Sequence, residues 1–285
     1  MEFIKKNNEN VLVVKEYELR NGNTMPLLHF PLLEKTGIVN HCFTTRFGGV
    51  SEGHCATLNL SFARGDDVEA VEKNFDLLAE AMGISVEDFV FSDQTHTTNI
   101  MKVTSENRGS GIVKAKNYSD IDGFITNEPN VMLSTFYADC VPLYFVDTVN
   151  KAIGLSHSGW KGTVNRMGKK TLDAMKEAYG TNPQNVICAI APSICVDCYE
   201  VSEDVASAFR EEFKGHEDEI LISKGNGKYQ LDLWKANEIV LLEAGVKKEH
   251  LAVTNICTCC NPKLLFSHRA SRGRRGNLGA FLGLK

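Results

Sequence analysis

The 285-residue sequence lacks the segments that mark membrane, secreted and repeat proteins. No stretch approaches the roughly 18 consecutive apolar residues of a membrane span. The N-terminal segment MEFIKKNNEN has no apolar core of the kind found in secretory signals. Internal repeats, low-complexity tracts and Pro/Ser-rich linkers are also missing. These absences predict one cytoplasmic domain over residues 1–285.

An excess of positive charge is missing as well. The chain has 31 basic and 36 acidic residues and a net charge of −5, which argues against a nucleic-acid or membrane-surface partner. One local exception is the run HRASRGRRGN near the C-terminus, which contains four arginines and a histidine. The run could hold an anion, although a solvated flexible segment explains it equally well.

Several common catalytic motifs do not occur. The chain has no G-x-G-x-x-G, Walker, G-x-S-x-G or H-E-x-x-H pattern, so nicotinamide-binding, P-loop, serine-hydrolase and zincin functions lose their main support. Nine cysteines, an odd number, in a cytosolic chain indicate free thiols or metal ligands rather than a disulfide framework.

The pattern of apolar residues predicts an α/β domain with a mixed β-sheet flanked by helices. Asp66 or Asp67 can begin a helix that Gly83 ends. Several central strands are continuous apolar runs, typical of strands covered on both faces. We expect helices at 66–83, 161–180, 202–213 and 234–245, and strands at 11–19, 37–46, 58–62, 89–96, 99–104, 122–126, 131–139, 142–147, 152–157, 185–192, 228–233 and 251–256.

Three residues with metal-binding side chains stand at the ends of expected strands, namely His96, Cys140 and His157. Side chains at strand ends can converge where loops begin. Two imidazoles and a thiolate with a fourth position open suit catalytic zinc, and copper would also fit. Each residue alone is more often a packing residue, so the hypothesis depends on all three meeting.

The neighbours of these residues suggest further roles. Asp139 could accept a hydrogen bond behind the metal site or carry a proton, or it could simply form a turn. After His157, the segment SGWKGT predicts a tight turn with Thr163 capping a helix, and Lys161 would add a positive charge. Arg46, in FTTRFGGVSEG, either belongs to a Gly-rich turn or faces an anionic substrate.

The remaining cysteines form two groups. Cys195 and Cys198 have the C-x-x-C spacing of metal ligands, whereas Cys257, Cys259 and Cys260 follow a C-x-C-C pattern. Together they could form a structural zinc or iron–sulfur site. The second group departs from the usual paired spacing, which argues against such a site.

Several motifs occur in the order found in a known family: FTTRFGGVS, LNLS, DQTH, DGFIT, ADCVPLYFVD, GLSHSGWKGT, CYEV and FSHRASRGRRGNLGAF. In these the chain resembles the multicopper polyphenol oxidoreductase (laccase-like) family. Members are also described as zinc-dependent purine nucleoside phosphorylases, adenosine deaminases or peptidoglycan editing factors. The resemblance runs from about Val39 to the C-terminus and leaves residues 1–35 as a variable N-terminal segment.

The resemblance implies a metal site of His96, Cys140 and His157 that holds Zn²⁺, with Cu²⁺ as the alternative. It also implies a fold similar to the toxin deamidases (cysteine hydrolase-like). The implied activities are phosphorolysis of adenosine, inosine, guanosine and methylthioadenosine, and deamination of adenosine. Two departures from the family pattern, QTHT at residues 94–97 in place of QVHG and HSGWKG at residues 157–162 in place of HAGWRG, leave the ligands in place. Lys161 replaces an arginine fork with a point charge.

The residues and the resemblance together predict purine nucleosides and phosphate as ligands. We expect Arg46, Lys161 and Arg269 to bind phosphate, and Asp139 to act as an acid or base. In deamination, zinc would activate the water that attacks the purine. The oligomeric state is not specified by the sequence.

Three other functions compete with this one. A copper oxidase acting on phenols would need many paired histidines, but the eight histidines here are scattered. A cysteine hydrolase or deamidase would use Cys140 as nucleophile and His157 as base. A non-enzymatic cell-envelope (peptidoglycan) regulatory protein would show no turnover.

Overall fold

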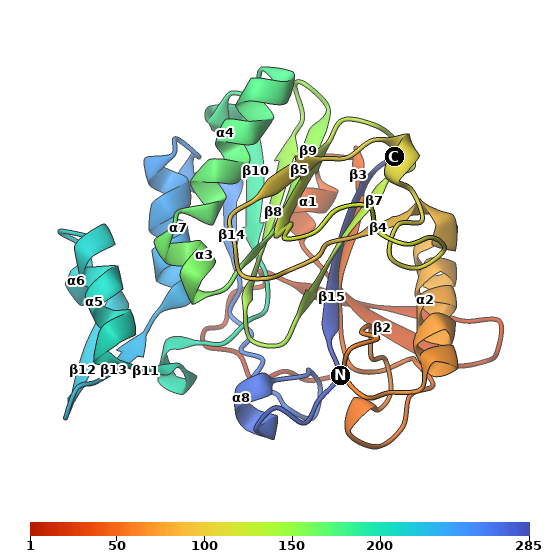
Figure 1. Ribbon diagram of the computed structural model, residues 1–285, viewed down its shortest axis with the longest axis horizontal. Coiled ribbons are helices and arrows are strands. Elements are labelled where there is room, and N and C mark those ends of the chain that lie inside the picture. The colour runs from red at the N-terminus through yellow and green to blue at the C-terminus, as the bar shows by residue number, and fades with distance from the viewer.

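Two six-stranded sheets face each other at the centre of the protein (Figure 1). The computed structural model describes residues 1–285. The first sheet has the order β1(Val13–Glu18), β2(Thr24–His29), β3(Val39–Thr44), β15(Leu278–Leu284), β7(Met132–Tyr137), β4(Phe89–Phe91). The second has the order β14(Leu251–Val253), β10(Val186–Ile190), β8(Val141–Asp147), β9(Ala152–Ser158), β6(Gly123–Thr126), β5(Ile100–Lys102). Both sheets contain parallel and antiparallel pairs.

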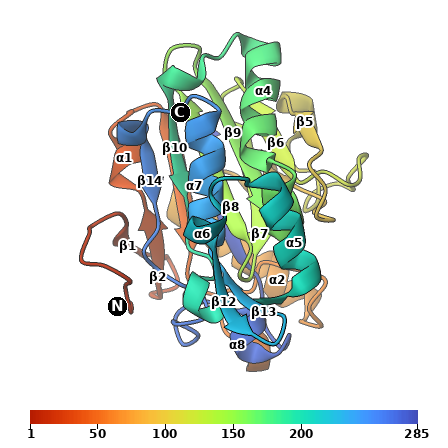
Figure 2. The same cartoon turned by 90° about the vertical axis from the view of Figure 1, so that its left-hand side faces the viewer.

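Helices cover the outer faces of this sandwich. Helix α2(Val68–Met82) packs on the first sheet, and α4(Met167–Tyr179) and α7(Leu233–Glu243) pack on the second (Figures 1 and 2). A small sheet of β11(Glu200–Ser202), β13(Lys228–Leu231) and β12(Leu221–Gly225) lies with α5(Glu203–Glu212) and α6(Glu217–Ile220) beside α7. The short helices are α1(Pro31–Glu34), α3(Trp160–Val164) and α8(His268–Ser271).

Three apolar clusters fill the spaces between these layers. The central cluster contains Phe43, Leu133, Tyr144 and Leu155 from facing strands of the two sheets. Strands β8 and β9 are buried along their whole length because one face meets the other sheet and the opposite face meets helices. The continuous apolar runs seen in the sequence therefore have their expected cause.

The mixed α/β architecture is confirmed, but two six-stranded sheets and a small three-stranded one stand in place of the single flanked sheet. Strand β15 was not predicted, although it lies in the middle of the first sheet; its sequence LGAFLGL contains glycines that weaken a strand pattern. Strand β2, which carries Pro26, was also missed. The expected strand at 58–62 is wrong, since those residues have no strand structure.

Helix boundaries agree where capping was clear. The Asp67 side chain accepts hydrogen bonds from the first turn of α2, and Gly83 ends the helix with φ 66°. The single helix expected at 161–180 is wrong, because Arg166, with φ 61°, separates α3 from α4. Thr163 lies inside α3 rather than at its start. None of the helices combines the length and the apolar character that crossing a membrane requires.

Candidate functional site

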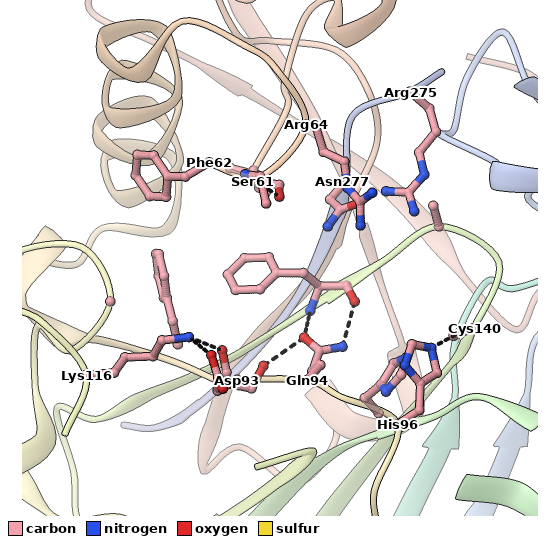
Figure 3. Close-up of a pocket in the computed structure, with 18 residues that line it drawn as sticks. Ser61, Phe62, Arg64, Asp93, Gln94, His96, Lys116, Cys140, Arg275 and Asn277 are labelled. Carbon is pink, nitrogen blue, oxygen red and sulfur yellow. Dashed lines mark hydrogen bonds and ion pairs between the residues drawn. The ribbon is translucent and has the colours of Figure 1, made fainter. Parts of the chain in front are cut away.

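His96, Cys140 and His157 converge where the two sheets meet. Cys140 lies where the chain passes from β7 in the first sheet to β8 in the second, and His157 lies on the neighbouring strand β9. His96 comes from the loop after β4, with φ 66°, so the strand expected through residue 96 ends earlier at Phe91. The three potential ligand atoms all lie within 4.8 Å of one another. Figure 3 shows the imidazole of His96 beside Cys140, with Nε2 3.9 Å from Sγ.

Asp122, at the start of the DGFIT segment, orients both histidines. Its carboxylate accepts a hydrogen bond from His157 Nδ1 at 2.7 Å and one from the backbone N–H of His96 at 3.1 Å. The backbone N–H groups of Thr95 and Thr97 and the Thr97 hydroxyl complete its shell. The Asp122 side chain is fully buried, yet both of its carboxylate oxygens accept hydrogen bonds. Because Nδ1 of His157 is occupied, Nε2 is the nitrogen available for a metal.

The electrostatics of the group favour a thiolate. Burial alone would raise the pKa of the Cys140 thiol, but the charge and hydrogen bond of His157 and the hydrogen bond of His96 outweigh it and lower that pKa to about 6. Burial alone would lower the pKa of His157, but Cys140 and Asp122 raise it to about 9. Burial also opposes the charge of Asp122, whose pKa nevertheless falls to about 2 through its bond to His157.

The donor set and its spacing fit a metal ion. Zinc binds imidazole nitrogen at about 2.0–2.1 Å and thiolate sulfur at about 2.3 Å, so ligands of one tetrahedral ion stand roughly 3–4 Å apart. Gly159 closes one side of the group, since a Cβ there would meet His96 Cδ2 at 3.0 Å and Cys140 Sγ at 3.2 Å. The three residues can therefore hold zinc or copper with a position left open.

A cavity of ≈ 460 Å³ opens above these three side chains. One wall is basic: Arg64 and Arg275 point into the cavity near Asn277 (Figure 3). Arg275 is only 8% exposed, and burial lowers its pKa to about 10. Its Nε and the Asn277 Oδ1 have no hydrogen-bond partner in the protein. Arg275 forms no salt bridge, although Asp139 is near enough to favour its charge, and a buried guanidinium of this kind suits an anionic ligand.

Another wall of the cavity is aromatic. Phe62, Phe91 and Phe136 line it, and Phe91 and Phe136 meet edge to face with ring centroids 5.0 Å apart. Gln94 bonds both the backbone N–H and the carbonyl of Phe136, at 2.7 and 2.8 Å, which holds the loop that carries His96. Asp93 pairs with Lys116 at the cavity edge, and this bond lowers the pKa of the Asp93 carboxyl.

The other residues selected from the sequence lie outside this cavity. Asp139, with φ 88°, turns the chain between the sheets, and its two oxygens accept bonds from the Thr258 hydroxyl and the Arg269 backbone. Arg46 donates to the carbonyls of Ala56 and Pro262.

The Arg269 and Lys161 side chains also have other contacts. The Arg269 guanidinium donates to the carbonyls of Cys198 and Glu200. Lys161 is exposed on α3, with its Nζ 5.7 Å from the ring of Trp160. The structure therefore brings together the three metal-ligand candidates, but not the residues expected to bind phosphate.

Sequence reasoning missed the residues that complete the site. Asp122 stands in the quoted DGFIT segment, but nothing local indicates that its carboxylate faces His157. Arg275 and Asn277 belong to the basic run HRASRGRRGN, whose charge had suggested an anion site without indicating which of its residues face the cavity. Arg64, in a loop before α2, had no signal beyond its charge.

Comparisons with known proteins identify relatives of this chain. Residues 40–285 match the family described as multi-copper polyphenol oxidoreductase laccase. The purine nucleoside phosphorylase YlmD of Bacillus subtilis (strain 168) is 37% identical over 247 residues, 85% of this chain and 87% of the relative. The adenosine deaminase RL5, from an unknown prokaryotic organism, is 30% identical over 213 residues, 74% of this chain and 81% of the relative. The crystal structure of YlmD from Geobacillus stearothermophilus is similar with a TM-score of 0.85 at 33% identity, covering 94% of this chain and 98% of that one.

Proposed function

This chain belongs to the multi-copper polyphenol oxidoreductase laccase family, and from that premise we propose that it is a zinc-dependent purine nucleoside phosphorylase that also deaminates adenosine. Its substrates would be adenosine, inosine, guanosine and methylthioadenosine. The observation that carries the proposal is the His96–Cys140–His157 group at the base of a cavity with one basic and one aromatic wall. The proposed fold relationship is to the toxin deamidases, over a single domain of residues 1–285.

In this proposal His96, Cys140 and His157 hold the metal. A thiolate with two imidazoles suits zinc, and copper is the alternative that the family description suggests. The ion would supply a Lewis acid and lower the pKa of water for deamination. Asp122 keeps the Nδ1 proton of His157 in place, so that the other ring nitrogen stays directed at the metal.

The two walls of the cavity divide the substrates between them. A purine ring is planar and apolar on its faces, so it fits the wall of Phe62, Phe91 and Phe136. Phosphate fits between Arg64 and Arg275, whose side chains point into the cavity beside Asn277. This assignment moves phosphate binding away from Arg46, Lys161 and Arg269.

Asp139 has a positioning role in this scheme rather than an acid–base one. Both of its carboxylate oxygens already accept hydrogen bonds, from Thr258 and from Arg269. Its backbone turn places Cys140 between the sheets. At the cavity edge, Asp93 and Lys116 instead offer an acceptor and a donor to the edge of a purine.

The primary test compares Cys140→Ala with Cys42→Ala, which removes a buried thiol outside the ligand group. Metal content is measured by elemental analysis, and conversion of adenosine with phosphate is followed by chromatography. We expect Cys140→Ala to lose metal from this site and turnover, while Cys42→Ala keeps both. Wild-type turnover and metal content in Cys140→Ala would refute the proposal.

Phosphate binding is tested with Arg275→Met against Arg46→Met. Hydrogen bonds to charged groups contribute about 1.5–3 kcal/mol, so Arg275→Met should raise the KM for phosphate about 10- to 150-fold. Arg46→Met should leave that KM nearly unchanged, because its guanidinium bonds backbone carbonyls. An unchanged phosphate KM in Arg275→Met would remove Arg275 from the phosphate site.

A second function is favoured by one specific observation. Cys140, His157 and Asp122 also resemble the nucleophile, base and orienting carboxylate of a cysteine hydrolase or deamidase. Stoichiometric alkylation of Cys140 in protein without bound metal would support that function.

Two further candidate functions predict different assay results. A copper oxidase should oxidise phenols once loaded with copper. A non-enzymatic cell-envelope (peptidoglycan) role should show no nucleoside turnover in metal-replete protein.

A further inference from the structure

A second group of metal-binding side chains lies apart from the cavity. Cys195 precedes and Cys198 ends a 3-10 turn before β11, and Cys257 and Cys260 lie in the segment after β14. Their four sulfur atoms all lie within 4.8 Å of one another. We propose that these four cysteines bind a structural zinc ion, at a site separate from the one on which the proposed function rests.

The spacing supports this once Cys259 is left out. Cys257 and Cys260 then form a C-x-x-C pair like that of Cys195 and Cys198, and two such pairs are typical of a structural zinc site. Taken together as one irregular C-x-C-C group, Cys257, Cys259 and Cys260 argue against the site. The structure corrects this, because the four-sulfur group excludes Cys259.

The distances fit one ion better than a disulfide. Cys260 Sγ lies 3.5 Å from Cys198 Sγ and 3.9 Å from Cys195 Sγ. A disulfide would need about 2.05 Å. Four sulfurs at about 2.3 Å from a tetrahedral zinc stand about 3.8 Å apart. An iron–sulfur cluster with several iron atoms would hold its cysteines farther apart, since they bind different irons.

Two backbone N–H groups and a lysine lie beside the sulfurs. The backbone N–H groups of Cys195 and Cys260 donate to Cys257 Sγ at 3.2 and 3.4 Å. Lys6, which pairs with Asp197 at 2.7 Å, adds a positive charge beside the group. Such N–H donors are needed because zinc with four thiolates carries a net negative charge.

The site joins segments that support the cavity. One segment, at Ser193–Cys198, leads into the small β11–β13 sheet, and the other follows β14. Between the cysteine pairs, the Thr258 hydroxyl donates to Asp139 at 2.6 Å and the Ile194 N–H donates to the Asp139 carbonyl at 2.9 Å. A zinc ion there would fasten both segments around the turn that carries Cys140.

The test is the metal content of untagged protein and three variants. We expect about two zinc ions per chain in the wild type and about one in His96→Ala/Cys140→Ala, which removes only the cavity site. Cys198→Ser/Cys260→Ser should also lose about one ion, and the matched control Cys259→Ser should lose none. Wild-type zinc content in Cys198→Ser/Cys260→Ser, or no zinc at all in His96→Ala/Cys140→Ala, would overturn the proposal.

A second measurement does not require the cysteine variants to fold. His96→Ala/Cys140→Ala is titrated with a mercurial thiol reagent while released zinc is followed with a chromogenic chelator. We expect zinc release to accompany modification of the clustered thiols. Thiol modification without zinc release, a disulfide among these four cysteines in native protein, or iron with acid-labile sulfide would each refute the zinc site. Loss of nucleoside turnover alone bears only on the proposed function.

Discussion

Replacing Asp122 with Asn should break the network that orients both histidines of the cavity site. Oδ1 accepts hydrogen bonds from His96 N–H and His157 Nδ1, and Oδ2 accepts from Thr95 N–H and from both the N–H and the hydroxyl of Thr97. An asparagine has only one acceptor oxygen, so its NH₂ group would face at least two donors in either orientation. The change is therefore not conservative at this position.

The expected magnitude follows from the buried charge. Removing one partner of a buried ion pair costs about 3–5 kcal/mol, and Asp122 is fully buried against His157. Loss of a carboxylate behind a metal-bound histidine lowers metal affinity or activity about 10- to 100-fold. We expect Asp122→Asn to show both effects, the first in urea unfolding of chelator-treated protein and the second in zinc competition with a fluorescent chelator.

Asp120→Asn provides the matched control. Asp120 lies in the same loop, is exposed, and accepts a bond from the Thr95 hydroxyl at 2.8 Å, but it does not contact either histidine. Its φ of 56° is one that asparagine adopts readily. We expect its free energy of unfolding to change by less than about 0.5 kcal/mol. If Asp122→Asn matches Asp120→Asn in stability and in zinc affinity, the orienting role of Asp122 is refuted.

Two other perturbations probe the site and the fold. Gly159→Ala should weaken zinc binding in the same competition assay, because its Cβ would press on His96 and Cys140, whereas a Cβ at Gly162 meets nothing nearer than 3.4 Å. Equal zinc affinity in the two glycine variants would contradict this. Burial lowers the pKa of His41 from 6.5 to about 3. The unfolded chain therefore protonates this histidine at a higher pH than the folded protein does, and the free energy of unfolding falls as the pH drops from 6.5 toward 3. Between pH 7 and pH 5, the free energy of unfolding measured by urea titration should fall by about 2 kcal/mol less in His41→Gln than in the wild type. An identical pH dependence of the two proteins would exclude His41 as the cause.

The helices and buried strands could be predicted where short-range chemistry decided them. Helix α2 begins after Asp67 and ends at Gly83, and both limits could be predicted because capping depends on neighbouring backbone groups. Strand β15 could not be found this way, because its two glycines hide a strand whose stability comes from β3 and β7 on either side. The number of sheets was equally hidden, since a strand buried on both faces has the same apolar sequence in a sandwich as in a sheet covered by helices.

The candidate ligands His96, Cys140 and His157 could be selected from the sequence because imidazole and thiolate chemistry belongs to the residue type. Their spacing within 4.8 Å, the carboxylate of Asp122 behind them and the basic wall with Arg275 were decided by the tertiary structure. The same holds for the four-cysteine group. Its C-x-x-C spacings can be read from the sequence, but only the tertiary structure brings Cys198 next to Cys260 and leaves Cys259 outside the group. Chemical identity is carried by single residues, whereas direction and distance between residues far apart in the chain exist only after the sheets and loops have packed.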